Sequence, residues 1–294
     1  MELRDKIKEL TRDFINKGGF VAGQALSAVG WCGGTIPDMP EGIIELPVSD
    51  LNNGGVVTGF ALAKPIQYVI RYQGFVWYNL VTILNYACKA KSWGTKCPIF
   101  IRAIAMEGSI GPVAGSSHHS LCYRMPGIKI YSPMTPGEYE KTYSDFIFDD
   151  EVYYVSEHRG SYNNSEELPD IWFEKPDFVL FPISITRFAA IEASKLLLAE
   201  GHKVSVHHQF ILKPFEIQDE WRDSLVNADG VVLDDDYPDG IASTLAHKLM
   251  LATSSKVYTM GLSDRTAGFS PQSDNLPPST KAIYDFVKGK LCSR

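Results

Sequence analysis

The run Pro98-Ile-Phe-Ile-Arg-Ala-Ile-Ala105 is nearly continuous in apolar residues, and Arg102 is its single charged member. A strand that is covered on both faces has such a composition, whereas a strand with one wet face alternates apolar and polar residues. We therefore expect this run to be a central strand of a parallel sheet. A loop rich in Gly and Ser follows it, from Glu107 to Ser120, and carries the pair His118-His119.

Strand and helix patterns alternate on both sides of this run, which indicates an α/β fold with a mainly parallel sheet and helices on both faces. The residues Asn52-Asn-Gly-Gly55 predict a loop. Thr135-Pro136-Gly-Glu138 has the composition of a helix start, with the threonine as N-cap. In the first half we expect strands at 20–23, 43–48, 65–72, 98–105, 128–133 and 151–155, and helices at 2–17, 56–63, 76–91 and from 135 onward.

The composition shifts to polar and turn-forming residues between 158 and 177. We interpret 161–177 as a linker between two domains, 1–160 and 178–294. The second domain is also α/β but smaller. Its expected strands are 178–183, 203–208, 230–236 and 256–260, and its expected helices are 189–200, 240–251 and 278–291.

Composition and charge exclude several classes of partner. The chain of 294 residues has a net charge of -7 and no Lys/Arg run, which argues against binding to nucleic acid or to an anionic membrane surface. No apolar run approaches the roughly 18 residues of a membrane-spanning helix, and the N-terminus lacks the apolar core of a signal peptide. The five cysteines form no CxxC pair, so we expect reduced thiols in a cytoplasmic protein.

Three features between residues 47 and 119 have the chemistry of half an active site for an aromatic cofactor. Asp50 supplies an acid, and His119 supplies an imidazole on the Gly/Ser loop. Tyr72, Phe75 and Tyr78 are flat rings that offer stacking area at little entropic cost. Each feature has a structural alternative, since an aspartate often caps the helix that follows it, and aromatic residues at this spacing more often pack in a core.

We expect no metal site on this chain. No Asp, Glu or Cys stands at ligand spacing beside His118-His119. His207-His208 are neighbours in an expected strand, where adjacent side chains point to opposite faces and cannot chelate together. Asp234-Asp235-Asp236 has the residue types of a metal site, but such a run is more often the solvated end of a strand.

Five segments carry a family resemblance: Pro47-Val-Ser-Asp50, Ile70-Arg-Tyr-Gln-Gly-Phe75, Ser116-Ser-His-His119-Ser120, Pro126-Gly-Ile-Lys-Ile-Tyr-Ser-Pro133 and Leu212-Lys-Pro214. Together they resemble the beta subunit of thiamine-diphosphate-dependent 2-oxo acid dehydrogenases, and more broadly the C-terminal half of transketolase-like enzymes. The resemblance covers nearly the whole chain. It implies a pyrimidine-binding transketolase-like domain over 1–160 and a transketolase C-terminal-like domain over 178–294.

In this family a carboxylic acid hydrogen-bonds the aminopyrimidine ring of the cofactor and supports the proton exchange that activates it. The resemblance gives this role to Asp50, which is one methylene shorter than the family's glutamate. It places Tyr72, Phe75 and Tyr78 around the pyrimidine. It also makes His119 the active-site histidine, with His118 as the weaker candidate, and a neutral imidazole would suit the expected proton transfers.

The family's motif for diphosphate and Mg²⁺ is Gly-Asp-Gly followed by Asn-Asn, and this sequence has no Gly-Asp-Gly. The resemblance therefore implies an alpha-type partner subunit that brings the diphosphate and Mg²⁺ site, with thiamine diphosphate shared between the chains of an alpha2-beta2 heterotetramer. The implied reaction is decarboxylation of a 2-oxo acid, or transfer of an acyl or ketol unit. The alternatives are the C-terminal subunit of a split transketolase and a non-catalytic regulatory subunit, for which Asp50 in place of glutamate is the best argument.

Overall fold

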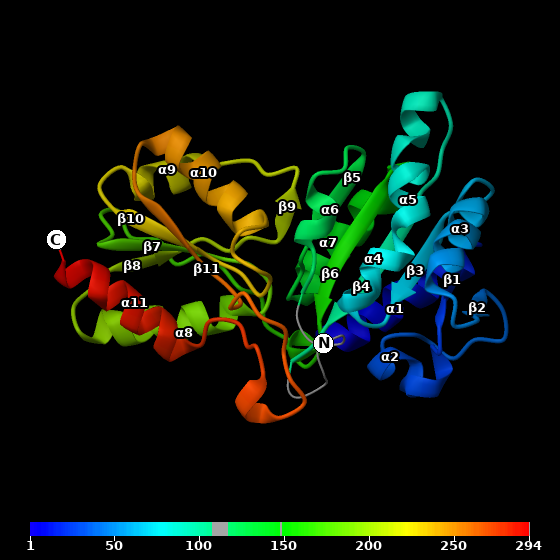
Figure 1. The fold of residues 1–294 in the computed structure, drawn as a ribbon, viewed down its shortest axis with the longest axis horizontal. Helices are drawn as coiled ribbons and strands as arrows, with labels where there is room; N and C mark the ends of the chain where they lie inside the picture. The colour runs from blue at the N-terminus through cyan, green and yellow to red at the C-terminus, as the bar shows by residue number, and fades with distance from the viewer. Residues whose placement is uncertain (108–116, 148, 294) are drawn as a thin grey trace.

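The computed structural model describes residues 1–107, 117–147 and 149–293, and it contains two separate sheets (Figure 1). Most of the Gly/Ser loop expected at 107–120 lies outside these residues. The first sheet has the order β2-β1-β3-β4-β6-β5-β9 and is parallel except for the β5–β9 pair. Its strands are β1 (Phe20–Gln24), β2 (Ile43–Leu46), β3 (Ile66–Ile70), β4 (Ile99–Ala105), β5 (Ile128–Tyr131), β6 (Val152–His158) and β9 (Ile211–Lys213).

The second sheet is parallel throughout and has the order β11-β10-β7-β8. Its strands are β7 (Phe178–Pro182), β8 (Val204–Val206), β10 (Asp229–Leu233) and β11 (Val257–Met260). The predicted α/β class with parallel sheets and helices on both faces is therefore confirmed. The domain bounds 1–160 and 178–294 remain a proposal.

Strand β4 lies in the middle of the first sheet, as its apolar run predicts. All seven of its residues are buried, and Ile99 pairs with Ile66 of β3 and with Val152 of β6. Successive side chains of β4 enter two different cores, with Ile101 in one and Phe100 in the other. A strand whose faces are both covered needs apolar residues at every position, which explains the continuous run.

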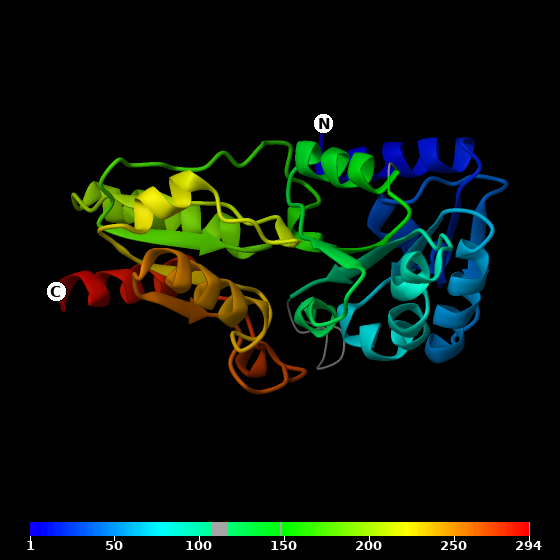
Figure 2. The same ribbon diagram turned by 90° about the horizontal axis from the view of Figure 1, so that it is seen from above.

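Helices cover both faces of each sheet. On the first sheet, α1 (Leu3–Asn16) and α7 (Pro136–Ile147) lie side by side on one face, as Figure 2 shows. The opposite face carries α3 (Asp50–Ala61), α4 (Val76–Asn79), α5 (Val81–Asn85) and α6 (Ser120–Tyr123), while the short α2 (Gly30–Gly34) lies beside α1. On the second sheet, α8 (Thr186–Ala199) packs with α11 (Thr280–Cys292), and α9 (Asp219–Leu225) packs with α10 (Ile241–Thr253). No helix among the described residues combines the length and the apolar composition needed to cross a membrane.

The loop predicted at Asn52-Asn-Gly-Gly55 is wrong, because these residues lie inside α3. Asn53 is buried and its side-chain amide donates to the carbonyl of Pro47 at 2.9 Å. A Cβ on Gly54 would lie 2.1 Å from the backbone oxygen of Asn79. The glycine is thus needed for close packing of α3 on α4, and this packing overrides its poor helix propensity.

The continuous helix predicted over 76–91 is also wrong, since the segment forms α4, α5 and a 3₁₀ turn at 87–93. Two asparagines mark the breaks. The side chain of Asn79 donates to the carbonyl of Phe75 at 2.9 Å, and that of Asn85 donates to the carbonyl of Val81 at 2.8 Å. These amides take carbonyls that a continuous helix would use for its backbone ladder.

Several contacts among the described residues hold the two sheets together, in addition to a shared apolar cluster. Strand β9 comes from the second half of the chain and pairs with β5 of the first sheet. Arg187 of α8 is fully buried and donates to the Glu138 carboxylate of α7 at 2.7 and 2.5 Å. Residues 117–120 bond to the acidic end of β10, which joins the carboxyl end of one sheet to that of the other.

The single charge in the β4 run is explained by a buried ion pair. Arg102 is fully buried and donates to both oxygens of Glu157, at 2.6 and 2.9 Å. The hydroxyl groups of Tyr139 and Tyr162 donate to the same carboxylate at 2.7 and 2.8 Å. Because each partner is desolvated, neither charge is tolerated without the other.

We expect Glu157→Gln to lower the free energy of unfolding by about 3 kcal/mol, because it leaves the Arg102 guanidinium buried without a counter-charge. Urea denaturation of the purified chain measures this. Glu192→Gln is the matched control, since Glu192 and its partner Lys195 have side chains 58% and 63% exposed. It should stay within about 0.5 kcal/mol of the parent protein. Equal losses in both variants would contradict the role of the buried pair.

Candidate functional site

A cavity of about 200 Å³ lies at the carboxyl ends of β1 and β3, beside the first turn of α3. In open α/β sheets, the carboxyl ends of parallel strands are the usual place for a ligand. The residues that line it are Gln24, Ala25, Val48, Asp50, Tyr68, Val69, Ile70, Arg71, Phe75 and Asn79. The cavity therefore combines one acid, one cation, two aromatic rings and two amides.

Asp50 is held in this cavity by two amides from different elements. Gln24 at the end of β1 donates to Asp50 Oδ1 at 2.8 Å, and Asn79 at the end of α4 donates to the same oxygen at 3.0 Å. The amide oxygen of Asn79 accepts from the hydroxyl of Tyr68, which fixes the amide in this orientation. Both donors use Oδ1, and no hydrogen bond from a described residue reaches Oδ2.

Asp50 does not cap a helix in the structure, which was its alternative role. Helix α3 begins at Asp50 with Ser49 as its N-cap residue, and no side chain caps it. The carboxylate of Asp50 bonds instead to side chains of β1 and α4. Gln24, Tyr68 and Asn79 were not predicted as site residues, because their contacts to Asp50 follow from the sheet order and not from sequence spacing.

The three predicted aromatic residues do not gather around Asp50. Phe75 lines the cavity, whereas Tyr72 does not. The ring centroids of Phe75 and Tyr72 lie 6.0 Å apart. Two guanidinium groups lie near the Tyr72 ring, that of Arg71 at 4.8 Å and that of Arg159 at 5.7 Å from its centroid. Tyr78 is 60% exposed and does not line the cavity.

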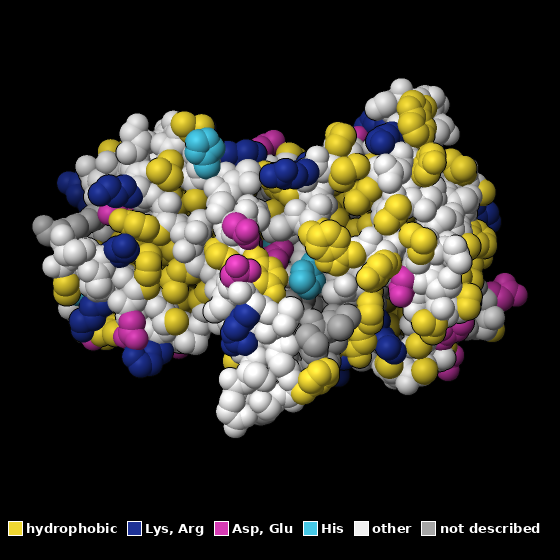
Figure 3. Space-filling model, viewed as in Figure 1, with side chains coloured by type: hydrophobic (Ala, Val, Ile, Leu, Met, Phe, Trp, Pro, Cys, Tyr) yellow, Lys and Arg dark blue, Asp and Glu magenta, His cyan; other side chains and the backbone are white. Residues whose placement is uncertain are grey.

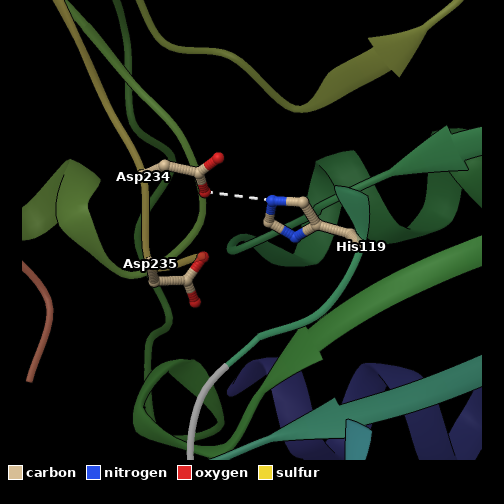
Figure 4. A group of neighbouring side chains, drawn as sticks. All are labelled: His119, Asp234 and Asp235. Carbon is tan, nitrogen blue, oxygen red and sulfur yellow. Dashed lines mark hydrogen bonds and ion pairs between the residues drawn. The ribbon is translucent and has the colours of Figure 1, made fainter. Parts of the chain in front are cut away.

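His119 lies apart from this cavity, in a buried cluster between the two sheets (Figure 4). Its side chain is fully buried, with Nε2 3.0 Å from Asp234 Oδ1 and Nδ1 3.1 Å from Ser156 Oγ. Burial by itself would lower the pKa of His119, but the charge and hydrogen bond of Asp234 raise it to about 10. The charge of Asp234 thus favours the protonated ring in this structure, whereas the expected proton transfers would suit a neutral imidazole.

The acidic run at the end of β10 is buried, not solvated as expected. Asp235 Oδ2 accepts from the hydroxyls of Ser117 and Ser184 at 2.6 and 2.8 Å, and Asp236 Oδ2 accepts from the backbone N–H of Ser120 at 2.9 Å. Burial raises the pKa of Asp235 to about 7. The expectation failed because the covering segment, 117–120, precedes the acids by more than 110 residues.

His118 faces a second cavity, of about 600 Å³, between the two halves of the chain. Trp77, Asp236 and Tyr237 also line it. Figure 3 shows acidic, apolar and histidine side chains gathered at this junction. Burial lowers the pKa of the His118 imidazole, although the charge of Asp236 opposes the shift.

Comparisons with known proteins support the resemblance seen in the sequence. No protein-family model matches the chain. It is 25% identical over 195 residues to the pyruvate dehydrogenase E1 component subunit beta of Mesostigma viride. This match covers 60% of this chain and 59% of that protein. The chain thus spans about 59% of the length of this curated relative.

Two solved structures share the fold. A split-gene transketolase described as an inactive beta4 tetramer matches with a TM-score of 0.76 and 15% identity over 99% of both chains. A mutant transketolase from Pichia stipitis matches with a TM-score of 0.75 and 13% identity, over 99% of this chain and 46% of that one. The chain therefore has a transketolase-like fold and resembles the beta-subunit class of pyruvate dehydrogenase E1 components.

Another buried imidazole, that of His158 at the end of β6, links stability to pH. Its Nδ1 accepts from the backbone N–H of Gly160 at 3.0 Å, and burial lowers its pKa to about 4. In the unfolded chain the imidazole takes up a proton near pH 6.5, whereas the folded chain does so only near pH 4. The unfolded state therefore binds more protons in this window, and stability falls as the pH is lowered through it.

Lowering the pH from 7.5 to 5.0 should reduce the free energy of unfolding of the parent protein. We expect this reduction to be about 2 kcal/mol larger in the parent protein than in a His158→Asn variant. The asparagine oxygen can still accept from Gly160 but does not titrate. Urea denaturation at both pH values measures the difference. His247→Asn serves as the control, because His247 is exposed. Identical pH dependence in the parent and in His158→Asn would contradict the assignment.

Proposed function

We propose that this chain is the beta-type subunit of a two-subunit, thiamine-diphosphate-dependent enzyme that acts on a 2-oxo acid or a ketose. The aminopyrimidine half of the site would lie in the Asp50 cavity. The observation that carries the proposal is the pair of amide donors on Asp50 Oδ1, at 2.8 and 3.0 Å, at the strand ends of a transketolase-like fold. A carboxylate held in this way presents one fixed oxygen to a ligand.

The residues of the cavity fit an aminopyrimidine. Asp50 Oδ2 is left to bond a ring nitrogen, Phe75 offers a flat apolar wall, and the backbone of β3 closes the third side. When bound, thiamine diphosphate supplies the electron sink for chemistry at a carbonyl carbon. Asp50 would hold a proton at the pyrimidine, and Gln24 and Asn79 would keep its carboxylate in place. The two amides fix the orientation of the aspartate, which is one methylene shorter than the family's glutamate.

The geometry favours His118 over His119 for contact with a substrate. His118 lines an open cavity, and its lowered pKa keeps the ring neutral near pH 7, as proton transfer requires. The ring of His119 is enclosed by Asp234 and Ser156 and is held as a cation. We retain both as proposed site histidines, with His119 in a positioning role for the segment that carries His118.

We further propose an alpha-type partner that brings the diphosphate and Mg²⁺ site, in an alpha2-beta2 assembly. Large apolar side chains are exposed along α3, α4, α5 and the turn after them, including Leu51, Phe60, Leu62, Trp77, Tyr78 and Tyr86. Trp77 and Tyr78 are 61% and 60% exposed. An apolar surface of this kind is typical of a subunit interface.

A second function of the same class is the C-terminal subunit of a split transketolase. The match over 99% of both chains to a split-gene transketolase favours it. Transfer of ketol units between sugars would then replace decarboxylation. A non-catalytic subunit is the third alternative, but the anchored carboxylate of Asp50 is a feature that a merely structural chain does not need.

We expect the chain, mixed with an alpha-type chain that carries Gly-Asp-Gly and Asn-Asn, to bind thiamine diphosphate in the presence of Mg²⁺. Asp50→Ala should weaken this binding at least tenfold and abolish turnover, since the pyrimidine loses its carboxylate partner. Titration calorimetry measures the binding. Asp38→Ala, at an exposed position of the same half, is the matched control. Unchanged binding and turnover in Asp50→Ala would contradict the proposed site.

The two enzymatic alternatives differ in their products. A decarboxylating enzyme releases CO₂ from its 2-oxo acid, whereas a transketolase transfers a two-carbon unit without gas release. Mass balance on candidate substrates with the mixed subunits therefore separates them. Tight cofactor binding without either activity would favour the regulatory alternative.

A further inference from the structure

The end of β10 buries three neighbouring carboxyl groups. Asp234, Asp235 and Asp236 are each at most 2% exposed. The Nε2 atom of His119 lies 3.0 Å from Asp234 and 4.0 Å from Asp236. Buried carboxylates are costly unless a counter-charge or a metal ion compensates them.

Two oxygens of this cluster have no partner in the described part of the chain. They are Asp234 Oδ2 and Asp235 Oδ1, and both are buried. The other oxygen of each group is fully used, by His119 for Asp234 and by Ser117 and Ser184 for Asp235. Buried polar atoms without a partner are rare in native proteins, and an ion is one of the few physical explanations for them.

The same side chains converge on one point. One potential ligand atom from each of His119, Asp234 and Asp235 lies within 4.8 Å of the other two. Figure 4 shows the imidazole reaching across from the segment before α6 toward the two carboxylates at the end of β10. One nitrogen and two carboxylate oxygens form a donor set that suits Zn²⁺ and its first-row neighbours better than Mg²⁺ or Ca²⁺.

The surroundings also resemble those of a built metal site. The second ring nitrogen of His119 contacts Ser156 Oγ at 3.1 Å, and the carboxylate of Asp235 is oriented by two serine hydroxyls. In metal sites, such outer contacts fix the orientation of the ligands. Here they come from three separate segments, so the ligands are positioned by the fold and not by a flexible loop.

We propose that His119, Asp234 and Asp235 bind one divalent first-row transition-metal ion, with Zn²⁺ as the best match. The ion takes the place of the hydrogen bond between His119 and Asp234, and it brings positive charge to the buried carboxyl groups. It ties residues 117–120 of the first half to β10 of the second. This site is separate from the Asp50 cavity and does not depend on the proposed cofactor or partner.

The test uses the full chain, stripped with a chelator and kept free of thiamine diphosphate and partner subunit. Zn²⁺ titrated by calorimetry should bind at one ion per chain, and Co²⁺ should give a visible absorption band from its nitrogen and oxygen ligands. The thermal midpoint should rise with Zn²⁺ and not with equal Mg²⁺. A parent protein that takes up no Zn²⁺ or Co²⁺ at this stoichiometry overturns the proposal before any variant is made.

Variants then locate the ion. Asp235→Asn keeps the size of the side chain and should weaken Zn²⁺ binding at least tenfold, and Asp234→Asn provides a second variant if the first fails to fold. Asp264→Asn is the control, because Asp264 is exposed and lies in the neighbouring cavity. Equal Zn²⁺ affinity in the parent and in Asp235→Asn or Asp234→Asn would overturn the assignment. The assignment would also be overturned if Asp235→Asn were more stable than the parent protein and Zn²⁺ stabilised neither of them. That result would mean that protons alone neutralise the buried carboxylates.

Discussion

The pair of His119 and Asp234 joins the carboxyl ends of two separate sheets and is one of the contacts that hold the two halves together. Each partner is fully buried, and their atoms lie 3.0 Å apart. A buried charge without its partner would cost several kcal/mol, so separating the halves is penalised at this point more than at a hydrophobic contact. The Arg187–Glu138 pair acts in the same way on the far side of the first sheet. Two desolvated ion pairs therefore hold the halves in register.

Asp50 depends on a different constraint, the close approach of α3 and α4. Gly54 permits this approach, because any side chain there would meet the backbone of Asn79. The approach in turn brings the Asn79 amide within 3.0 Å of Asp50. The same amide interrupts the helix by bonding the carbonyl of Phe75. One asparagine thus ends α4, packs against a glycine of α3 and orients the acid, which explains why this stretch departs from simple helix patterns.

Local sequence patterns were sufficient to predict much of the fold but little of the candidate site. The β4 run and the N-cap at Thr135 are encoded by neighbouring residues, and the structure has both, with Thr135 Oγ1 accepting from the Glu138 N–H at 3.2 Å. The helix over 76–91 failed because the side chains of Asn79 and Asn85 take backbone carbonyls that a continuous helix would use. The link between His119 and the acids of β10 could not be foreseen, since the partners are 115 residues apart and their contact follows from how two sheets dock.

The turn from Phe75 to Asn79 couples the cavity to the exposed apolar surface. Phe75 and Asn79 line the Asp50 cavity, whereas Trp77, between them, lines the cavity between the halves and is 61% exposed. In the proposed assembly, a partner that covers Trp77 would restrain the same short helix that orients Asp50. A ligand that orders this helix favours the binding of both the cofactor and the partner. Binding of either one should therefore strengthen binding of the other. A chain with an acid of shorter reach gains most from such coupling, because its site tolerates the least movement.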